Sequence, residues 1–277
     1  VKLISPQYVK PFVKGNKTDR NDAEAIAEAA SRPSMRYVTI KSIEQQDIQC
    51  IHRIRERGIG QRTQLVNQIR GILAEYGIVI TQGVAAVRKA IPVILEDRLN
   101  ELTERTRTYI QMLYLELLEI DRKIIFYDKE IITIYKQSEV AQRISQIEGV
   151  GPIISTAIIA LGDLKTFKNG RHFAAFLGLV PRESSSGEKQ RFLGITKRGN
   201  TYIRKLLIHG ARSVIFRVKD KDDAKSVWIK QLKERRGMNR TACAVANKTA
   251  RVIWGIFNSC ECYRPSRRMD LDTSTSA

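Results

Sequence analysis

The chain has 277 residues, and 43% of them are hydrophobic, enough for one large domain or two ordinary domains with apolar cores. Lysine and arginine number 48 against 29 aspartate and glutamate residues, a formal net charge of +19. This surplus favours a polyanionic partner, nucleic acid before an anionic membrane surface. No run of about 18 apolar residues exists to span a bilayer, and no secretory signal opens the chain. We therefore expect a cytoplasmic protein without a membrane partner.

The beginning of the chain predicts a short buried strand, a basic loop and a helix. Val1–Ser5 has the composition of a strand. Thr18 or Asp19 can cap the helix that follows, the alanine-rich segment 23–30 continues it, and the Arg32–Pro33 pair ends it.

Asp19 and Asp22 lie three residues apart in the expected first turn of this helix, so their side chains project to one side. Acids at a helix N-terminus are favoured by the helix dipole alone. Two neighbouring carboxylates can instead share a Mg²⁺ ion that assists chemistry at a phosphate. The spacing by itself favours the helix-dipole explanation.

The middle of the chain predicts two long helices, at about 42–76 and about 96–137, because apolar residues recur every three or four positions. The second helix lacks internal proline and glycine and is long for a globular protein. A coiled-coil-like hairpin or dimerisation arm and two packed helices within one bundle explain the pattern equally well. The four cysteines and three histidines have no zinc-site spacing, so any metal would be a hard cation bound by oxygen.

A second domain is expected after Ser138, where glycines begin to punctuate short apolar runs. Residues 144–164 read as helix, tight G-V-G-P turn and helix, with Gly149 and Gly151 in the turn. This helix-hairpin-helix pattern can grip a nucleic-acid backbone without reading its sequence. The alternative is a glycine-rich turn between two core helices.

The segment 178–211 places three serines before Gly187, between basic residues on both sides. A serine hydroxyl among cations could attack a phosphodiester, because the cations would stabilise the developing charge. The simpler alternative is a loop, since Ser-Ser-Gly is common turn chemistry. The nucleic-acid contacts predicted from the turns and the basic segment are Gly149, Gly151, Arg182, Lys189, Arg191, Lys197, Arg198 and Arg204.

Four ordered blocks of this sequence together resemble one family of proteins. The blocks are "KTDRNDAEAIAEA", "NQIRGILAEYGI", "IEGVGPIISTAIIA" and "FLGLVPRESSSGEKQRFLGITKRGNTYIRKLLIHGAR". They resemble the insertion-sequence transposases numbered one-ten and eleven-eleven, and the likeness covers nearly the whole chain. The resemblance implies an RNase H-like domain with an Asp-Glu-Asp-Asp tetrad, a coiled-coil region and a C-terminal transposase domain.

The resemblance also assigns roles to residues of this chain. Asp19 and Asp22 match the last two acids of the tetrad and would bind Mg²⁺, and Ser186 matches the nucleophile, with Ser185 as the second choice. The implied partners are DNA, a guide RNA encoded by the element, and further copies of the chain. The first Asp and the Glu of the tetrad match nothing after Val1, so we expect an N-terminally truncated transposase with an incomplete metal site.

We therefore expect a mostly helical α+β fold. Its expected parts are a partial RNase H-like domain (1–40), a helical or coiled-coil region (41–138), a transposase domain with the helix-hairpin-helix (139–258) and a disordered tail (259–277). The expected function is DNA cutting and rejoining by a serine nucleophile. A nucleic-acid-binding remnant or regulator without catalysis is the alternative.

Overall fold

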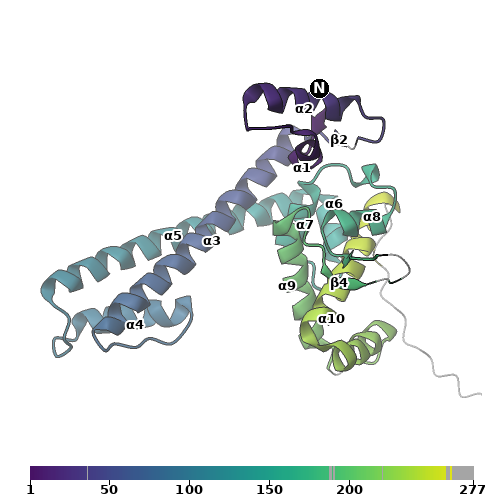
Figure 1. Cartoon of the computed structure of the whole chain (residues 1–277). Helices are drawn as coiled ribbons and strands as arrows, with labels where there is room; N and C mark the ends of the chain where they lie inside the picture. Colours follow the sequence, from purple (N-terminus) through teal and green to yellow (C-terminus); the bar gives the residue numbers. More distant parts are fainter. Residues whose placement is uncertain (36, 187–188, 190, 220, 260–262, 264–277) are drawn as a thin grey trace, which may run out of the picture.

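A computed structural model describes the chain except residues 36, 187–188, 190, 220, 260–262 and 264–277. Figure 1 shows a helical body, a long arm that projects from it, and a small N-terminal unit above the start of the arm. Helices dominate the described residues and the strands are short, which confirms the predicted mostly helical fold. The division into domains stays a prediction. Of the tail expected at 259–277, only Ser259 and Tyr263 are described.

The N-terminal unit contains β1 (Leu3–Ile4), α1 (Pro6–Val9), the 3-10 helix η1 (Lys10–Phe12), α2 (Asp19–Ser31) and β2 (Tyr37–Val38). The two strands pair antiparallel, with Leu3 opposite Val38. The prediction of a buried strand at Val1–Ser5 is wrong in its extent and burial, because β1 has two residues and Leu3 is 45% exposed. Among the described residues, β1 pairs only with β2, so it has no sheet around it to bury it.

The arm is a hairpin of two long helices, α3 (Ile43–Glu75) and α5 (Glu104–Gln137), with α4 (Val84–Glu96) at its tip (Figure 1). α3 begins close to the start of the predicted helix 42–76, and a capping box between Ser42 and Gln45 stabilises its first turn. The second predicted helix, 96–137, begins later than expected. The side chain of Asp97 accepts a hydrogen bond from a loop N–H, and Thr103 then caps α5.

Each part of the arm has its own stabilising contacts. At the tip, the buried residues Leu65, Ile69 and Leu73 of α3 belong to a cluster that α4 and α5 complete. Nearer the body, Arg55 of α3 pairs with Asp128 of α5. Since the arm packs its two helices against each other over their length, it matches the predicted helical hairpin rather than two helices inside one larger bundle.

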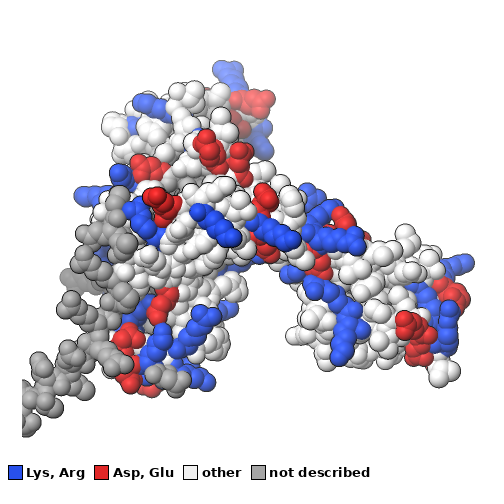
Figure 2. Space-filling view, turned by 180° about the vertical axis from the view of Figure 1, so that it is seen from behind, with Lys and Arg blue, Asp and Glu red and all other residues white. Residues whose placement is uncertain are grey.

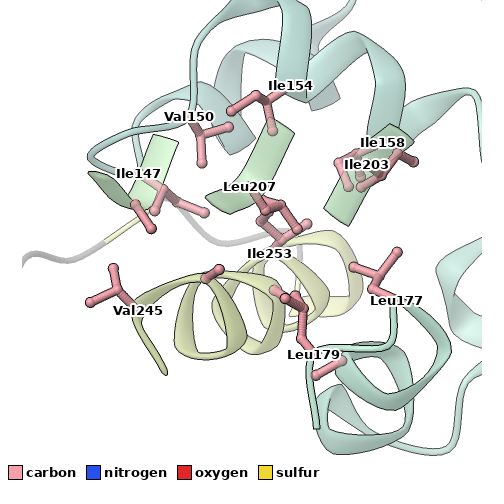
Figure 3. Close-up of a cluster of buried hydrophobic side chains, with 14 of the residues drawn as sticks. Ile147, Val150, Ile154, Ile158, Leu177, Leu179, Ile203, Leu207, Val245 and Ile253 are labelled. Atoms are coloured by element: carbon pink, nitrogen blue, oxygen red, sulfur yellow. The ribbon is translucent and has the colours of Figure 1, made fainter. Parts of the chain in front are cut away.

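The body contains the remaining elements of the structure. They are α6 (Glu139–Ser145), α7 (Pro152–Ile159), η2 (Leu164–Thr166), α8 (Gly170–Phe176), β3 (Pro181–Glu183), β4 (Phe192–Ile195), α9 (Thr201–Arg217) and α10 (Ala224–Ser259). Figure 3 shows their shared core, in which Ile158, Leu207 and Ile253 converge from α7, α9 and α10. Within α10, Gly237 has φ +74° and ψ 170°, so α10 bends sharply there.

Candidate nucleic-acid interface

The two acids of the opening motif lie side by side at the start of α2. The Thr18 hydroxyl accepts a hydrogen bond from Asn21 N–H at 3.2 Å, which fixes Asp19 and Asp22 in the first helical turn. Asp19 is exposed and Asp22 is half-buried. Neither forms an ion pair with a Lys or Arg of the described residues. Both carboxylates are therefore accessible, as a binding role for a cation requires.

No third potential ligand joins the two acids in the part of the chain that the structure describes. There, no group of three His, Cys, Asp or Glu side chains could hold a metal ion. Oxygen donors suit a hard cation such as Mg²⁺, and the pair supplies two of them. Asp19 and Asp22 therefore suit a part of a metal shell, and their binding of a cation stays a prediction.

The serines lie at the end of a two-stranded hairpin. β3 and β4 pair antiparallel with an irregular register, Pro181 opposite Ile195 and Glu183 opposite Phe192. Beyond them Ser186 and Lys189 form an isolated bridge, with Lys189 N–H donating to Ser186 O at 3.3 Å. The residues predicted to flank the serines, Arg182, Lys189 and Arg191, are all exposed. The hairpin therefore presents hydroxyl and cationic groups together to solvent.

Hydrogen bonding distinguishes Ser185 from Ser186. The Ser185 hydroxyl donates to Glu183 Oε1 at 2.7 Å and accepts from Arg191 N–H at 3.4 Å. Among the described residues, no hydrogen bond engages the hydroxyl of Ser186, which is exposed. Ser186 is thus free to meet a ligand, whereas Ser185 is held beside a carboxylate that could accept its proton.

Arg204 has a different role from the one expected. Its side chain is 7% exposed, and its guanidinium donates to Leu177 O and Arg198 O, both at 3.1 Å. Next to it, a Cβ on Gly178 would lie 2.1 Å from Arg198 O, so the turns before and after the hairpin are in close backbone contact. Arg204 therefore fixes the base of the hairpin from inside the protein, and it is not placed to meet a phosphate.

The G-V-G-P segment forms a turn between α6 and α7. Gly149 has φ +84°, and a Cβ there would lie 2.6 Å from Gly210 O, so this glycine permits the turn to pack closely on α9. Gly151 precedes α7 and has open space where a Cβ would be. Ser155 is fully buried. Two short helices, α6 and α7, therefore flank the turn, while the helix-hairpin-helix assignment and its use as a grip on nucleic acid stay predictions.

A groove of about 1880 Å³ lies beside the hairpin. Its walls come from the start of α8, from β4, from α9 and from the residues of α10 on both sides of Gly237. Its basic residues, which define what we call the cation groove, are Arg171, Lys197, Arg212, Arg236, Arg240, Lys248 and Arg251. No Asp or Glu lies among the described residues that line it. The groove therefore concentrates positive charge.

The cations of this groove are not neutralised within the described chain. Each ion pair of the described residues uses other Lys and Arg side chains. Arg212 of α9 donates instead to Asn239 Oδ1 of α10 at 3.1 Å, which links two walls. Burial raises the pKa of the Cys243 thiol, and the neighbouring Arg212 and Lys197 act in the opposite direction. The cation groove therefore has the electrostatics of an anion-binding site.

The sequence prediction found only part of this groove. Of the predicted contacts, Lys197 lines it, while Arg198 is exposed outside its lining. The α10 residues were missed, although Arg240, Asn247 and Arg251 recur at helical spacing along one face. This helical spacing is the sequence feature from which these groove residues could have been predicted. Arg171 and Arg212 reach the groove only through tertiary packing, so no local sequence pattern could predict that they line it.

A buried polar cluster joins the arm to the body. His52 of α3 is 2% exposed, with Nδ1 2.9 Å from Tyr202 Oη and Nε2 3.0 Å from Thr156 Oγ1. Burial, and then the positive charge of Arg55, lower the pKa of His52 to about 4. Burial raises the pKa of Tyr202 to about 12. The imidazole is therefore neutral at pH 7, donating from one nitrogen and accepting at the other.

Comparisons with known proteins agree with the resemblance. Residues 1–78 match the family DEDD_Tnp_IS110, described as a transposase, and residues 141–227 match a family described as "Transposase IS116/IS110/IS902 family". None of the described helices is both long and apolar enough to cross a membrane.

Three relatives are similar over most of their length. The transposase for insertion sequence element IS1111A of Coxiella burnetii is 49% identical over 95% of this chain and 72% of its own length. A probable family 20 transposase of Pseudomonas aeruginosa is 45% identical over 96% and 79%. The transposase for insertion sequence element IS1328 of Yersinia enterocolitica is 39% identical over 92% and 75%. This chain therefore belongs to the IS116/IS110/IS902 family of transposases, as the resemblance predicted.

Proposed function

We propose that the chain takes part in cutting and rejoining the DNA ends of an insertion sequence, with Ser186 as the nucleophile. The observation that carries this proposal is the free, exposed Ser186 hydroxyl at the end of a cationic hairpin whose base lines the cation groove. Arg182, Lys189 and Arg191 would neutralise the phosphate that the serine attacks.

In the proposed first step, Ser186 Oγ loses its proton and forms a bond to phosphorus, and a sugar oxygen of the DNA leaves and takes up a proton. The bond to serine then conserves the free energy of the broken phosphodiester. A hydroxyl at another DNA end can attack the same phosphorus, so that serine leaves and the strands are joined. Asp19 and Asp22 would hold Mg²⁺, which supplies positive charge at a phosphate.

A single chain does not bring these groups together. α2 packs on α1 and η1, whereas β3 packs on β4, and Figure 1 shows the two regions on separate parts of the molecule. We therefore include a homo-oligomer in the proposal, because a further copy of the chain is the simplest source of the missing neighbour. An element-encoded guide RNA remains the second proposed nucleic-acid partner beside DNA.

The alternative function is nucleic-acid binding without catalysis, as a remnant or as a regulator of a relative. The specific observation in its favour is the separation of Asp19 and Asp22 from Ser186, together with the absence of a third metal ligand among the described residues. The cation groove and the basic hairpin would serve this function unchanged.

Trapping a covalent adduct distinguishes the two functions. The chain would be incubated with Mg²⁺ and labelled DNA that carries the junction of its own insertion sequence, then denatured and resolved by size. Catalysis by serine predicts a DNA adduct that survives denaturation, disappears in Ser186→Ala and persists in Ser185→Ala. An adduct lost only in Ser185→Ala would move the nucleophile to the serine beside Glu183. Salt-sensitive DNA binding without any adduct would support the binder instead.

A further inference from the structure

We propose that the cation groove holds an unpaired nucleic-acid strand, with its phosphates on the groove's Lys and Arg side chains and its bases against Phe192 and Trp228. The inference rests on the proposed function in taking a nucleic acid as the ligand. It does not depend on the serine chemistry.

The size of the groove indicates a polymer rather than a small molecule. Its volume of about 1880 Å³ exceeds the ~300–1,000 Å³ of typical small-molecule pockets. Arg171 contributes from α8, Lys197 from the segment after β4, and Arg251 from the second half of α10. Charges distributed over several walls in this way suit a chain of phosphates better than one anion.

The aromatic side chains of the groove distinguish an unpaired strand from a duplex. Phe192 lies on β4 at the groove wall and is 64% exposed. Trp228 of α10 also lines the groove and is half-buried, and the Lys248 ammonium lies 4.7 Å from its ring centre. In a duplex the faces of the bases are already stacked on one another, so these aromatic rings would find no free base face on which to stack. An unpaired strand offers its base faces, and aromatic stacking on them is sequence-tolerant.

Apolar residues between the cations support the same ligand. Leu193, Ile208 and Leu232 line the groove together with the basic side chains. A site that contacted phosphates alone would gain nothing from apolar walls, whereas unpaired bases carry apolar faces that such walls can remove from water.

The groove is also placed where the proposed chemistry needs a strand. Pro181 of β3 and Phe192–Ile195 of β4 line it, and the same hairpin carries Ser186 at its far end. A strand in the cation groove would therefore run beside the base of the serine hairpin.

The chain provides its own reporter for a binding test. It contains two tryptophans, Trp228 and Trp254, and both line the groove. Intrinsic fluorescence of the full chain would be followed during titration with oligo(dT), oligo(rU), an abasic deoxyribose-phosphate oligomer and a duplex with the same number of phosphates. We expect both unpaired strands to quench the fluorescence. We expect the abasic oligomer and the duplex to bind at least about fivefold more weakly, because stacking is lost.

Two exposed phenylalanines form a matched pair of test and control. Phe192→Leu removes a ring in the groove, and Phe216→Leu removes an equally exposed ring, 65% against 64%, that does not line it. By anisotropy of labelled oligo(dT), Phe192→Leu should lower affinity by about fivefold or more and leave binding of the abasic oligomer unchanged. Phe216→Leu should change neither. Trp228→Leu repeats the test on α10.

The outcomes separate this proposal from the proposed function. Equal affinity for strand, duplex and abasic oligomer, with no effect of Phe192→Leu or Trp228→Leu, would overturn the unpaired-strand site, even if the Ser186 adduct forms. The expected base-dependent binding without any adduct would support the site and contradict the serine chemistry. A preference between oligo(dT) and oligo(rU) would identify the strand as DNA or RNA, and either supports the site.

Discussion

The arm and the cation groove both contain many arginines, but their arginines have different partners. In the arm, Arg62 Nη1 lies 3.2 Å from Asp121 Oδ1, and Arg88 Nε lies 2.7 Å from Asp121 Oδ2. The contact between Arg88 and Asp121 is an ion pair whose geometry is not that of a hydrogen bond. Figure 2 shows acidic and basic side chains next to one another along the arm. In the groove, no carboxylate of the described residues pairs with a cation.

The difference explains why a net charge of +19 does not by itself locate a binding surface. A cation with a neighbouring carboxylate contributes to holding two helices together and has little net field at a distance. Unpaired cations gathered in one groove add their fields and attract a polyanion. The comparison therefore predicts that arm variants affect stability, whereas groove variants affect nucleic-acid binding.

The largest expected effect on stability comes from the buried acid of the arm. Asp121 is 7% exposed and faces two arginines, so Asp121→Ala leaves their charges without a counter-charge. We expect a loss of about 3 kcal/mol of unfolding free energy, at the lower end for a broken buried pair because Arg88 can turn to solvent. Denaturant unfolding would measure it. An unchanged midpoint would show that arm ion pairs are not structural.

The joint between arm and body should be sensitive to acid. In the unfolded chain His52 takes up a proton near pH 6.5, whereas in the folded chain its pKa is about 4. Since the unfolded state then binds more protons, stability falls as the pH drops from 6.5 towards 4, by about 2 kcal/mol at pH 5.

Unfolding at pH 7, 6 and 5 would be compared between the wild type and His52→Gln. The variant should be less stable at pH 7, because it loses the contacts to Thr156 and Tyr202, but it should lack this part of the acid sensitivity. Parallel losses in both proteins would show that His52 is not the titrating group.

The smallest effect is expected at an exposed ion pair near the arm tip. Arg98 pairs with Glu104, and their side chains are 71% and 79% exposed. Solvent screening leaves such a pair worth about 0–1 kcal/mol, so Arg98→Ala should change the unfolding free energy by less than about 0.5 kcal/mol. A larger loss, measured in the same denaturant assay, would mean that the pair has a role in the tip that its exposure does not suggest.

Local signals predicted the parts of the fold that depend on local chemistry. The recurrence of apolar residues every three or four positions predicted α3 from about residue 42. Thr18, one of the two caps predicted for α2, places Asp19 and Asp22 in its first turn. The start of α5 was placed too early, because the side-chain hydrogen bond of Asp97 that shapes the preceding loop was not anticipated.

The local sequence could not predict which side chains of a basic segment point to solvent and which point into the protein. Arg198 and Arg204 are six residues apart in the same run of cations, yet one is exposed and the other is bonded to carbonyls inside the body. Only the packing of the hairpin base on α9 decides between them. The cation groove combines α8, β4, α9 and both halves of α10, so its charge becomes evident only when these elements are assembled.

The salt dependence of DNA binding in two matched double variants tests the central claim most directly. Arg240→Ala with Arg251→Ala removes two groove cations, and Arg98→Ala with Arg122→Ala removes two exposed arm cations that pair with glutamates. Both variants lower the net charge by the same two units. We expect the groove variant to reduce the slope of log K against log salt by about 1.4–1.8, and the arm variant to leave it unchanged. Equal reductions in both would contradict the account, because binding would then follow net charge and not the unpaired cations of the groove.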